Sequence, residues 1–325
     1  MPCYNSEAYV EKAIKSIVGQ TYPFWELIIV NDGSYDRTLD IVTGYANQDH
    51  RIKVFSKENG GYATAVNFGL DKISGDYFLF LGSDDYLDIH LFERLCNSFE
   101  EYGVQPDMVA FRTQIVTKDG ELKGVEEYTN FPKPLLTKAT FPEFNRSNPE
   151  YAAIFSIRDT SRCYKTALLG DTRYFGKTGV DADGIFSMLI SHKANTFLNL
   201  PVDAYYWYIR ENSVSSSAPS LKKHLDRISN WHQFFEIIST QYKNEITSTE
   251  QRYLISLSHL MVELSSSPLR AIKYRKLIKK EAKFTIYLCK QLNVSPFRFI
   301  CNVAKTPFLF SLVYQLYSFL RKGKD

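Results

Sequence analysis

Short apolar runs alternate with amphipathic runs along residues 6–90. The run ELIIV at 26–30 stops at the turn sequence NDGS, a pattern typical of a strand buried on both faces of a parallel sheet. Helical spacing of apolar residues is seen at 6–20, 36–46 and 61–74, and further strand-like runs are seen at 51–57 and 76–82. The alternation predicts an α/β fold with a mostly parallel sheet flanked by helices.

Carboxylates follow two of the predicted strands. Asp32 comes directly after the first run, and Asp84 and Asp85 come after the strand at 76–82. Ligands of such sheets bind outside the carboxyl ends of the strands, so these side chains are expected to face one crevice. Carboxylates without neighbouring Cys or His suit Mg²⁺ or Mn²⁺. For Asp85 a second reading is equally open, because Asp is also a favoured N-cap of a following helix.

The cysteines and the apolar stretches bear on location. Five Cys, an odd number with no CxxC spacing, favour a reducing compartment over a secreted one. The N-terminus lacks the basic and apolar regions of a signal peptide. The apolar stretch at 307–320 is too short to span a bilayer. These features predict a cytoplasmic protein.

Charge divides the chain into two parts. Residues 268–325 hold 13 Lys and Arg against 2 Asp and Glu, whereas the rest holds 26 against 34. Apolar side chains at helical spacing begin near Leu221, so we predict a domain at 1–215 and a basic helical domain at 216–325. Basic, aromatic-rich helices suit the surface of an anionic membrane, here the inner face of the plasma membrane, or a helical bundle or homodimer contact. Nucleic acid is not expected, because no recognised binding motif accompanies the charge.

Residues 103–180 are the least informative part. The segment at 107–124 predicts a strand that turns at KDGE into a hairpin, and 131–153 predicts an irregular, Pro-punctuated connection of the kind that often shapes a binding pocket. Its aromatic residues are expected to pack in the core rather than to stack on a ligand. They are Phe131, Phe141, Phe144 and Tyr151.

The succession PCYNSEAYVEKAIKSIVGQTYPFWELIIVNDGSYDRTLDI, followed by NGGYATAVNFGLDKISGDYFLFLGSDDYLD, resembles the family 2 glycosyltransferases. A weaker resemblance resumes at VDADGIF and YYWYIRENSVSSS. The resemblance implies the GT-A fold and an inverting transfer of a sugar from a nucleotide-sugar donor. A UDP-sugar is the favoured donor, and Mg²⁺ or Mn²⁺ is the expected cofactor. The acceptor would be a hydroxyl of a saccharide or lipid-linked saccharide in the synthesis of cell-surface polysaccharide, such as capsule.

The resemblance also implies roles for single residues. Asp183 matches the general base, although it or Asp181 could instead cap the helix that follows. Asp84 matches the second acidic position of the metal motif, with Asp85 beside it. The positions that match the donor site are Pro2, Tyr4, Asn5, Asp32, Gly61, Asn67, Asp84 and Arg210. Each has an alternative: Asp32 and Gly61 could belong to ordinary turns, Asn67 to a solvated helix face, and Arg210 to a surface ion pair.

Three positions depart from the family pattern. Gly82 replaces the first Asp of the acidic motif, and Val66 stands where many members carry Arg. The family also has an apolar first strand directly before the loop at Pro2, so we expect the natural start upstream and the first strand absent from 1–215. These departures keep an alternative open, a catalytically weakened scaffold that binds a partner or membrane through its helical tail. A sugar nucleotidyltransferase is disfavoured, because the first strand lacks a Gly-rich loop with Arg and Lys.

Overall fold

A computed structural model gives the fold and describes residues 1–117, 120–131, 133–148, 151, 155, 158–176, 181–209 and 221–242, with the single positions 276, 283 and 287. The chain divides into two compact units, Met1–Asn230 and Trp231–Asp325. The expected boundary near residue 215 lies outside the described residues, as do Arg210 and nearly all of the basic C-terminal segment. The helix expected from Leu221 is confirmed as α7 (Leu221–Gln241).

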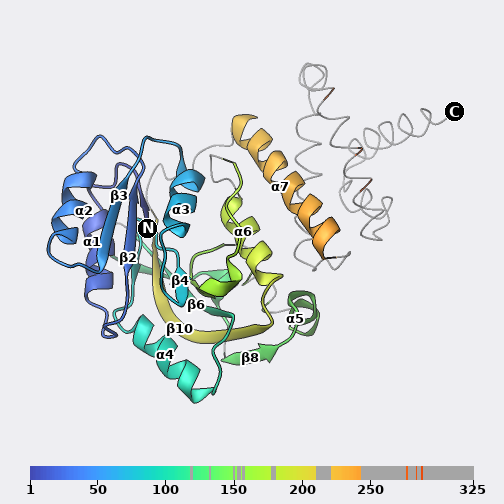
Figure 1. The fold of residues 1–325 in the computed structure, drawn as a ribbon. Helices are drawn as coiled ribbons and strands as arrows, with labels where there is room; N and C mark the ends of the chain where they lie inside the picture. The colour runs from blue at the N-terminus through green and yellow to red at the C-terminus, as the bar shows by residue number, and fades with distance from the viewer. Residues whose placement is uncertain are drawn as a thin grey trace. The chain divides into compact units, whose positions relative to one another are not determined.

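The first unit begins with a small parallel sheet in the order β1-β2-β3. Its strands are β1 (Pro2–Cys3), β2 (Leu27–Asn31) and β3 (Ile52–Ser56). Every residue of β2 is buried, because helices cover both of its faces. Figure 1 shows α1 (Val10–Val18) and α2 (Thr38–Ala46) on one side of this sheet and α3 (Tyr62–Leu70) on the other.

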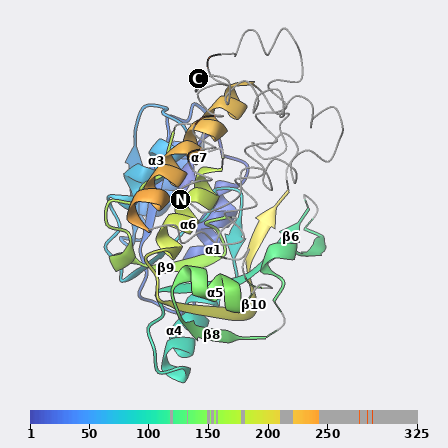
Figure 2. The same ribbon diagram turned by 90° about the vertical axis from the view of Figure 1, so that its right-hand side faces the viewer.

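A second sheet follows the order β4-β9-β6-β10-β5, with β7 paired to β6 and β8 paired to β10. The chain elements that build and cover it are β4 (Tyr77–Leu79), β5 (Tyr86–Leu87), α4 (Leu91–Glu101), β6 (Met108–Val116), β7 (Leu122–Val125), the 3₁₀ turn Glu127–Thr129, β8 (Leu135–Lys138), α5 (Phe141–Ser147), β9 (Arg162–Lys165), the 3₁₀ turn Thr166–Leu168, α6 (Ala182–Ser191) and β10 (Thr196–Tyr208). Figure 2 shows β8 and α5 grouped at one end of β10.

The α/β class with helices flanking the sheet is confirmed, and the sheet of β1, β2 and β3 is parallel throughout. The second sheet is mixed: β6 and β10 run parallel, while β5, β7, β8 and β9 pair antiparallel to their neighbours. The antiparallel strands are short, and β7 returns on β6 through the hairpin predicted at KDGE. Such returns do not require a crossover helix, so the helix–strand alternation of the first part of the chain does not continue.

Aromatic side chains fill the core between the second sheet, α5 and α6. Phe131, Phe141, Phe144 and Tyr151 are at most 2% exposed, which confirms that they pack in the core. The irregular connection expected at 131–153 is wrong in part, because it contains β8 and α5. Helix α5 begins at a capping box, in which the Glu143 carboxylate accepts hydrogen bonds from the backbone N–H and hydroxyl of Thr140. Among the described residues, no helix is long and apolar enough to cross a membrane.

Candidate active site

Loops that follow the carboxyl ends of strands from both sheets contact each other. The hydroxyls of Ser6, after β1, and Ser83, after β4, lie 2.8 Å apart. The pKa of Cys3 is raised to about 12, mainly by burial and also by the negative charge of Asp84. The segments that follow β1 and β4 are thus in contact through Ser6 and Ser83, and Asp84 lies within electrostatic reach of Cys3. That Asp32, Asp84 and Asp85 face one crevice stays a prediction.

Asp32 is a clamp between two of these loops. Its carboxylate accepts hydrogen bonds from the backbone N–H groups of Gly60 and Gly61, at 3.0 and 2.8 Å. Lys57 Nζ lies 2.6 Å from Asp32 Oδ1. Gly61 has φ 90°, a conformation that favours glycine, and it precedes the first turn of α3. Asp32 and Gly61 thus hold the loop before α3 against the end of β2.

We expect Asp32→Ala to lower the free energy of unfolding by about 1–3 kcal/mol, because the half-buried N–H groups of Gly60 and Gly61 would lose their acceptor and Lys57 would lose one of its partners. Urea unfolding would measure the loss. The matched control is Asp40→Ala on the exposed face of α2, which should change stability by less than about 0.5 kcal/mol. Equal stability of the two variants would contradict the clamp.

The first loop is tied to the turn after β2. Asn5 has φ 48°; its N–H donates to Ser34 Oγ at 3.0 Å, and its Oδ1 accepts from the Tyr35 N–H at 3.0 Å. The rings of Tyr4 and Tyr35 meet edge to face with centroids 6.2 Å apart, and Tyr35 is 84% exposed. Pro2 lies in β1, paired with Val30. Asn5 therefore positions two accessible aromatic rings at the rim of the crevice.

Gly82 lies between the two carboxylates of the acidic motif. A Cβ at this position would stand 2.6 Å from Asp85 Oδ2 and 3.1 Å from Asp84 Oδ1. The carboxylates of Asp84 and Asp85 thus lie close to the glycine, and a side chain at this position would require Asp85 to shift.

Asp85 is bonded to the end of β10. Its Oδ2 accepts from the Tyr205 hydroxyl at 2.5 Å and its Oδ1 from the Tyr208 N–H at 2.9 Å. Burial, and then the charge of Asp84, raise the pKa of Asp85 to about 7. Helix α4 begins at Leu91, well beyond Asp85, so the reading of Asp85 as its N-cap is wrong.

Tyr62, in the first turn of α3, has a pKa that several carboxylates affect. Desolvation raises its pKa well above the usual value, and the charges of four carboxylates raise it further. In order of effect these are Asp159, Asp183, Asp85 and Asp84. Carboxylates from three separate segments of the chain thus lie within electrostatic reach of one phenol, and no local pattern marks Tyr62 or Asp159 as members of this group.

Asp183 lies in the first turn of α6. Desolvation raises its pKa to about 6, the Gly184 N–H opposes the rise, and the charge of Asp181 adds to it. Asp181 is the N-cap residue, with φ 55° and no side-chain capping bond; its carboxylate lies 2.8 Å from Arg227 Nε in an ion pair. Neither carboxylate caps α6 through its side chain in the way the alternative reading supposed.

A cation faces the carboxylates from the loop before β9. The charge of Arg158 lowers the pKa of both Asp85 and Asp183. Its guanidinium lies 4.2 Å from the centre of the Trp207 ring, and its Nε lies 3.1 Å from Glu126 Oε1. Arg158 was not among the predicted site residues, since its position next to them depends on long-range pairing of β6, β9 and β10.

Asn67 is occupied by a structural contact. Its side-chain amide donates to the Tyr174 carbonyl at 3.0 Å and accepts from the Tyr174 N–H at 2.8 Å. Asn67 thus joins α3 to the loop before α6 and is not a solvated helix residue.

The carboxylates of the acidic motif would hold a divalent cation only together with oxygen atoms of a bound substrate. Asp84 and Asp85 supply hard carboxylate oxygens, but among the described residues no group of three His, Cys, Asp or Glu side chains could hold a metal ion. Both Asp85 oxygens already accept hydrogen bonds, which would compete with a cation for this carboxylate. A cation at Asp84 would need further oxygens, such as those of a diphosphate.

Comparison with known proteins identifies the family. Residues 1–160 match the model of Glycosyl transferase family 2. They form a family 2 glycosyltransferase domain. The family 2 domain includes the loops and carboxylates described above except Asp181, Asp183, the loop before α6 and the end of β10.

Curated relatives of the family 2 domain come from bacteria. The chain is 40% identical to glycosyltransferase GlyA of Streptococcus pneumoniae serotype 4 over 220 residues, which are 66% of this chain and 31% of GlyA. It is 41% identical over 113 residues to the minor teichoic acid biosynthesis protein GgaB of Bacillus subtilis, 34% of this chain and 13% of GgaB. The aligned region spans 31%, 39% and 29% of the first three relatives, about a third of their length.

The fold is also that of a solved structure, S. aureus TarS 1–349 in complex with UDP-GlcNAc. The TM-score is 0.66 at 23% identity, covering 88% of this chain and 79% of that chain. This similarity confirms the predicted GT-A fold for the family 2 domain.

Proposed function

We propose that this chain is an inverting glycosyltransferase that moves a sugar from a nucleotide-sugar donor to a hydroxyl of a saccharide or lipid-linked saccharide. The observation that carries the proposal is the match of residues 1–160 to the family 2 glycosyltransferases, and the electrostatic influence of Asp84, Asp85 and Asp183 on Tyr62 supports it. A UDP-sugar is the favoured donor, because TarS shares the fold and is described in complex with UDP-GlcNAc. Relatives such as GgaB favour a role in cell-surface polysaccharide synthesis.

Asp183 would act as the general base. An acceptor hydroxyl must lose its proton as it attacks the anomeric carbon, and a carboxylate with a pKa of about 6 accepts that proton more readily than an ordinary Asp. At neutral pH most of this group is still ionised. One base and one direct displacement lead to inversion at the anomeric carbon.

Donor binding would use the first loop and the turn after β2. The exposed rings of Tyr4 and Tyr35 offer apolar faces to a nucleobase, and Asn5 fixes both segments. Asp32 and Gly61 would support this surface by holding the loop before α3, and Pro2 would set the path of the chain into it. Arg158, besides Arg210, is a cation that could face a diphosphate.

Asp84 would hold Mg²⁺ or Mn²⁺, with Asp85 orienting β10 beside it. A cation held there supplies Lewis-acid stabilisation of the charge that develops on the leaving diphosphate. The acceptor is inferred from composition and family alone. The same holds for contact of residues 216–325 with the inner face of the plasma membrane or with a second copy of the chain.

A second candidate is a weakened scaffold that binds a partner through its tail. The engagement of both Asp85 oxygens by Tyr205 and Tyr208 favours it, because these hydrogen bonds compete with metal binding by Asp85.

The test is release of nucleotide from UDP-, GDP- and dTDP-sugars by the purified chain, with and without Mn²⁺. We expect turnover of one nucleotide class, UDP, and loss of turnover when the metal is chelated. A folded sample that turns over none of the donors and binds none of the nucleotides would overturn the transferase proposal in favour of the scaffold.

A further inference from the structure

Arg158 is held on two sides, by an aromatic ring and by a carboxylate. Its guanidinium carbon lies 4.2 Å from the centre of the Trp207 ring, and its Nε lies 3.1 Å from Glu126 Oε1. Within the described part of the chain, its terminal nitrogens Nη1 and Nη2 donate no hydrogen bond, and 30% of the side chain is exposed. The two nitrogens that can bind an anion side by side are therefore open.

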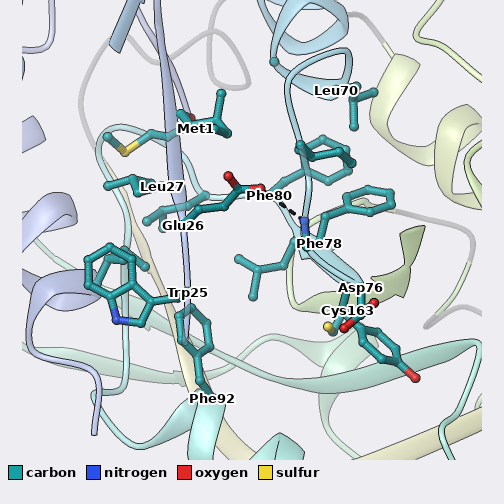
Figure 3. A pocket seen from close by; sticks show the side chains of 18 of the residues that line it. Met1, Trp25, Glu26, Leu27, Leu70, Asp76, Phe78, Phe80, Phe92 and Cys163 are labelled. Atoms are coloured by element: carbon teal, nitrogen blue, oxygen red, sulfur yellow. Dashed lines mark hydrogen bonds between the residues drawn. The ribbon is translucent and has the colours of Figure 1, made fainter. Parts of the chain in front are cut away.

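A second arginine, Arg51, has the same two kinds of neighbour but no open nitrogen. Its guanidinium carbon lies 3.8 Å from the centre of the Trp25 ring, and Figure 3 shows Trp25 among the side chains around an apolar cavity beside β2. Asp49 accepts hydrogen bonds from Nε and Nη2 of Arg51, at 3.0 and 2.7 Å, and the Pro23 carbonyl accepts one from Nη1 at 3.0 Å. This side chain is also 30% exposed. Exposure and the ring–carboxylate arrangement thus do not by themselves leave an arginine open, as Arg158 is.

The carboxylate that holds Arg158 is itself fixed by backbone hydrogen bonds. The Glu126 N–H donates to the Thr113 carbonyl of β6 at 2.8 Å, and the Glu126 carbonyl accepts from the Thr129 N–H at 3.0 Å. The Glu126 side chain is only 8% exposed. Water and salt screen a pair of this kind less than a pair on the surface. Glu126 can therefore hold the guanidinium of Arg158 in one orientation.

Trp207 determines the face of β10 on which Arg158 lies. Trp207 and Tyr205 are two positions apart in this strand, so their side chains project from the same face. The Tyr205 hydroxyl donates to Asp85 Oδ2. The charge of Arg158 lowers the pKa of Asp85 and of Asp183. Arg158 thus lies on the side of β10 that carries Asp85, within electrostatic reach of both carboxylates.

We propose that Glu126 and Trp207 are positioning residues that present the terminal nitrogens of Arg158 to the diphosphate of the donor. Arg158 has this role only if the proposed function holds, because that function supplies the diphosphate. Two parallel N–H groups match two oxygens of a phosphate, which the single ammonium of a lysine does not. The ring and the carboxylate restrict rotation of the guanidinium, so less conformational entropy is lost on binding. An anionic group of the acceptor has the same chemistry, and the test separates the two sources.

The test compares the affinities of the full chain for UDP and for uridine, without metal and without acceptor, by NMR chemical-shift titration. For Arg158→Gln we expect the affinity for UDP to fall about 30-fold and that for uridine to stay within about twofold, because uridine has no phosphate. Arg158→Lys keeps the charge but binds one oxygen at a time, so it should lose about tenfold. Arg51→Gln is the matched control, directly before β3, and should change neither affinity by more than about twofold.

Glu126→Gln and Trp207→Leu test the positioning roles. Each should lower the affinity for UDP about fivefold with uridine unchanged, and Trp207→Phe, which keeps a ring, should recover most of the loss. In the Arg158→Gln background neither change should lower the affinity for UDP further, because both act through Arg158. A loss that persists in that background would overturn the positioning roles.

Three outcomes would overturn the assignment of Arg158 to the donor. One is an equal loss of affinity for UDP and uridine in Arg158→Gln, which would make the role structural. Another is unchanged binding of UDP by Arg158→Gln together with weaker binding of inorganic phosphate to the UDP-bound chain; the arginine would then take an anionic group of the acceptor, and the transferase proposal would stand. The third is a folded, unaltered chain that binds neither UDP nor uridine, which would overturn the proposed function as well.

Discussion

Asp183→Asn is expected to lower kcat for sugar transfer by about 10³-fold while the affinity for the donor nucleotide stays within about twofold. Asn keeps the size and polarity of the side chain but cannot accept the acceptor's proton. In the unaltered chain kcat/KM should rise with pH through about 6, the pKa of Asp183, because only the ionised carboxylate acts as a base. The variant should lose this rise.

Asp181→Asn is the matched control, since it lies two residues away at the N-cap of α6 and pairs with Arg227. Asn tolerates the left-handed backbone of this position, so kcat should fall by less than about threefold. Steady-state kinetics over pH 5 to 8 would decide. A residual activity of Asp183→Asn above about a tenth, with the pH profile retained, would exclude Asp183 as the base.

Asp84→Asn is expected to weaken Mn²⁺-dependent binding of UDP by about 100-fold, measured by calorimetric titration with and without the metal. The reason is that Asp84 matches the second acidic position of the family's metal motif, whereas both oxygens of Asp85 accept hydrogen bonds from Tyr205 and Tyr208. Binding without metal should change little, because the nucleobase surface at Tyr4 and Tyr35 is separate.

Asp76→Asn serves as the control for charge, since this exposed carboxylate lies at the other end of β4. It should bind UDP as the unaltered chain does. If Asp84→Asn kept its full metal dependence, the cation would have to be held by other residues and the carry-over of Asp84 from the family motif would be wrong.

The parts of the fold that the sequence predicts well are those with local periodicity. β2 is five buried residues in a row, and α1 and α3 follow from helical spacing close to their observed bounds. Helix α5 was missed, although Thr140 and Glu143 form a capping box signal in the printed sequence. The antiparallel pairing of β4 with β9 could not be predicted, because it joins Phe78 to Tyr164 without a repeating pattern.

Among the site residues, too, only those that a local sequence pattern marks could be predicted. Asp84, Asp85 and Asp32 stand out because they follow apolar runs at strand ends. That Asp32 clamps a loop and that Asp85 bonds to Tyr205 depends on partners 28 and 120 positions away. Tyr62, Arg158 and Asp159 enter the site through tertiary packing alone, so neither spacing nor composition marks them.

Gly82 has a consequence for engineering. The family pattern suggests Asp at this position, and a design guided by consensus would restore it. A Cβ here would lie 2.6 Å from Asp85 Oδ2, and the Gly82 N–H donates to the Tyr205 hydroxyl at 3.2 Å. Restoring Asp would push Asp85 off Tyr205 and loosen the end of β10. Position 82 is therefore coupled to 85 and 205, and a useful redesign has to change all three together.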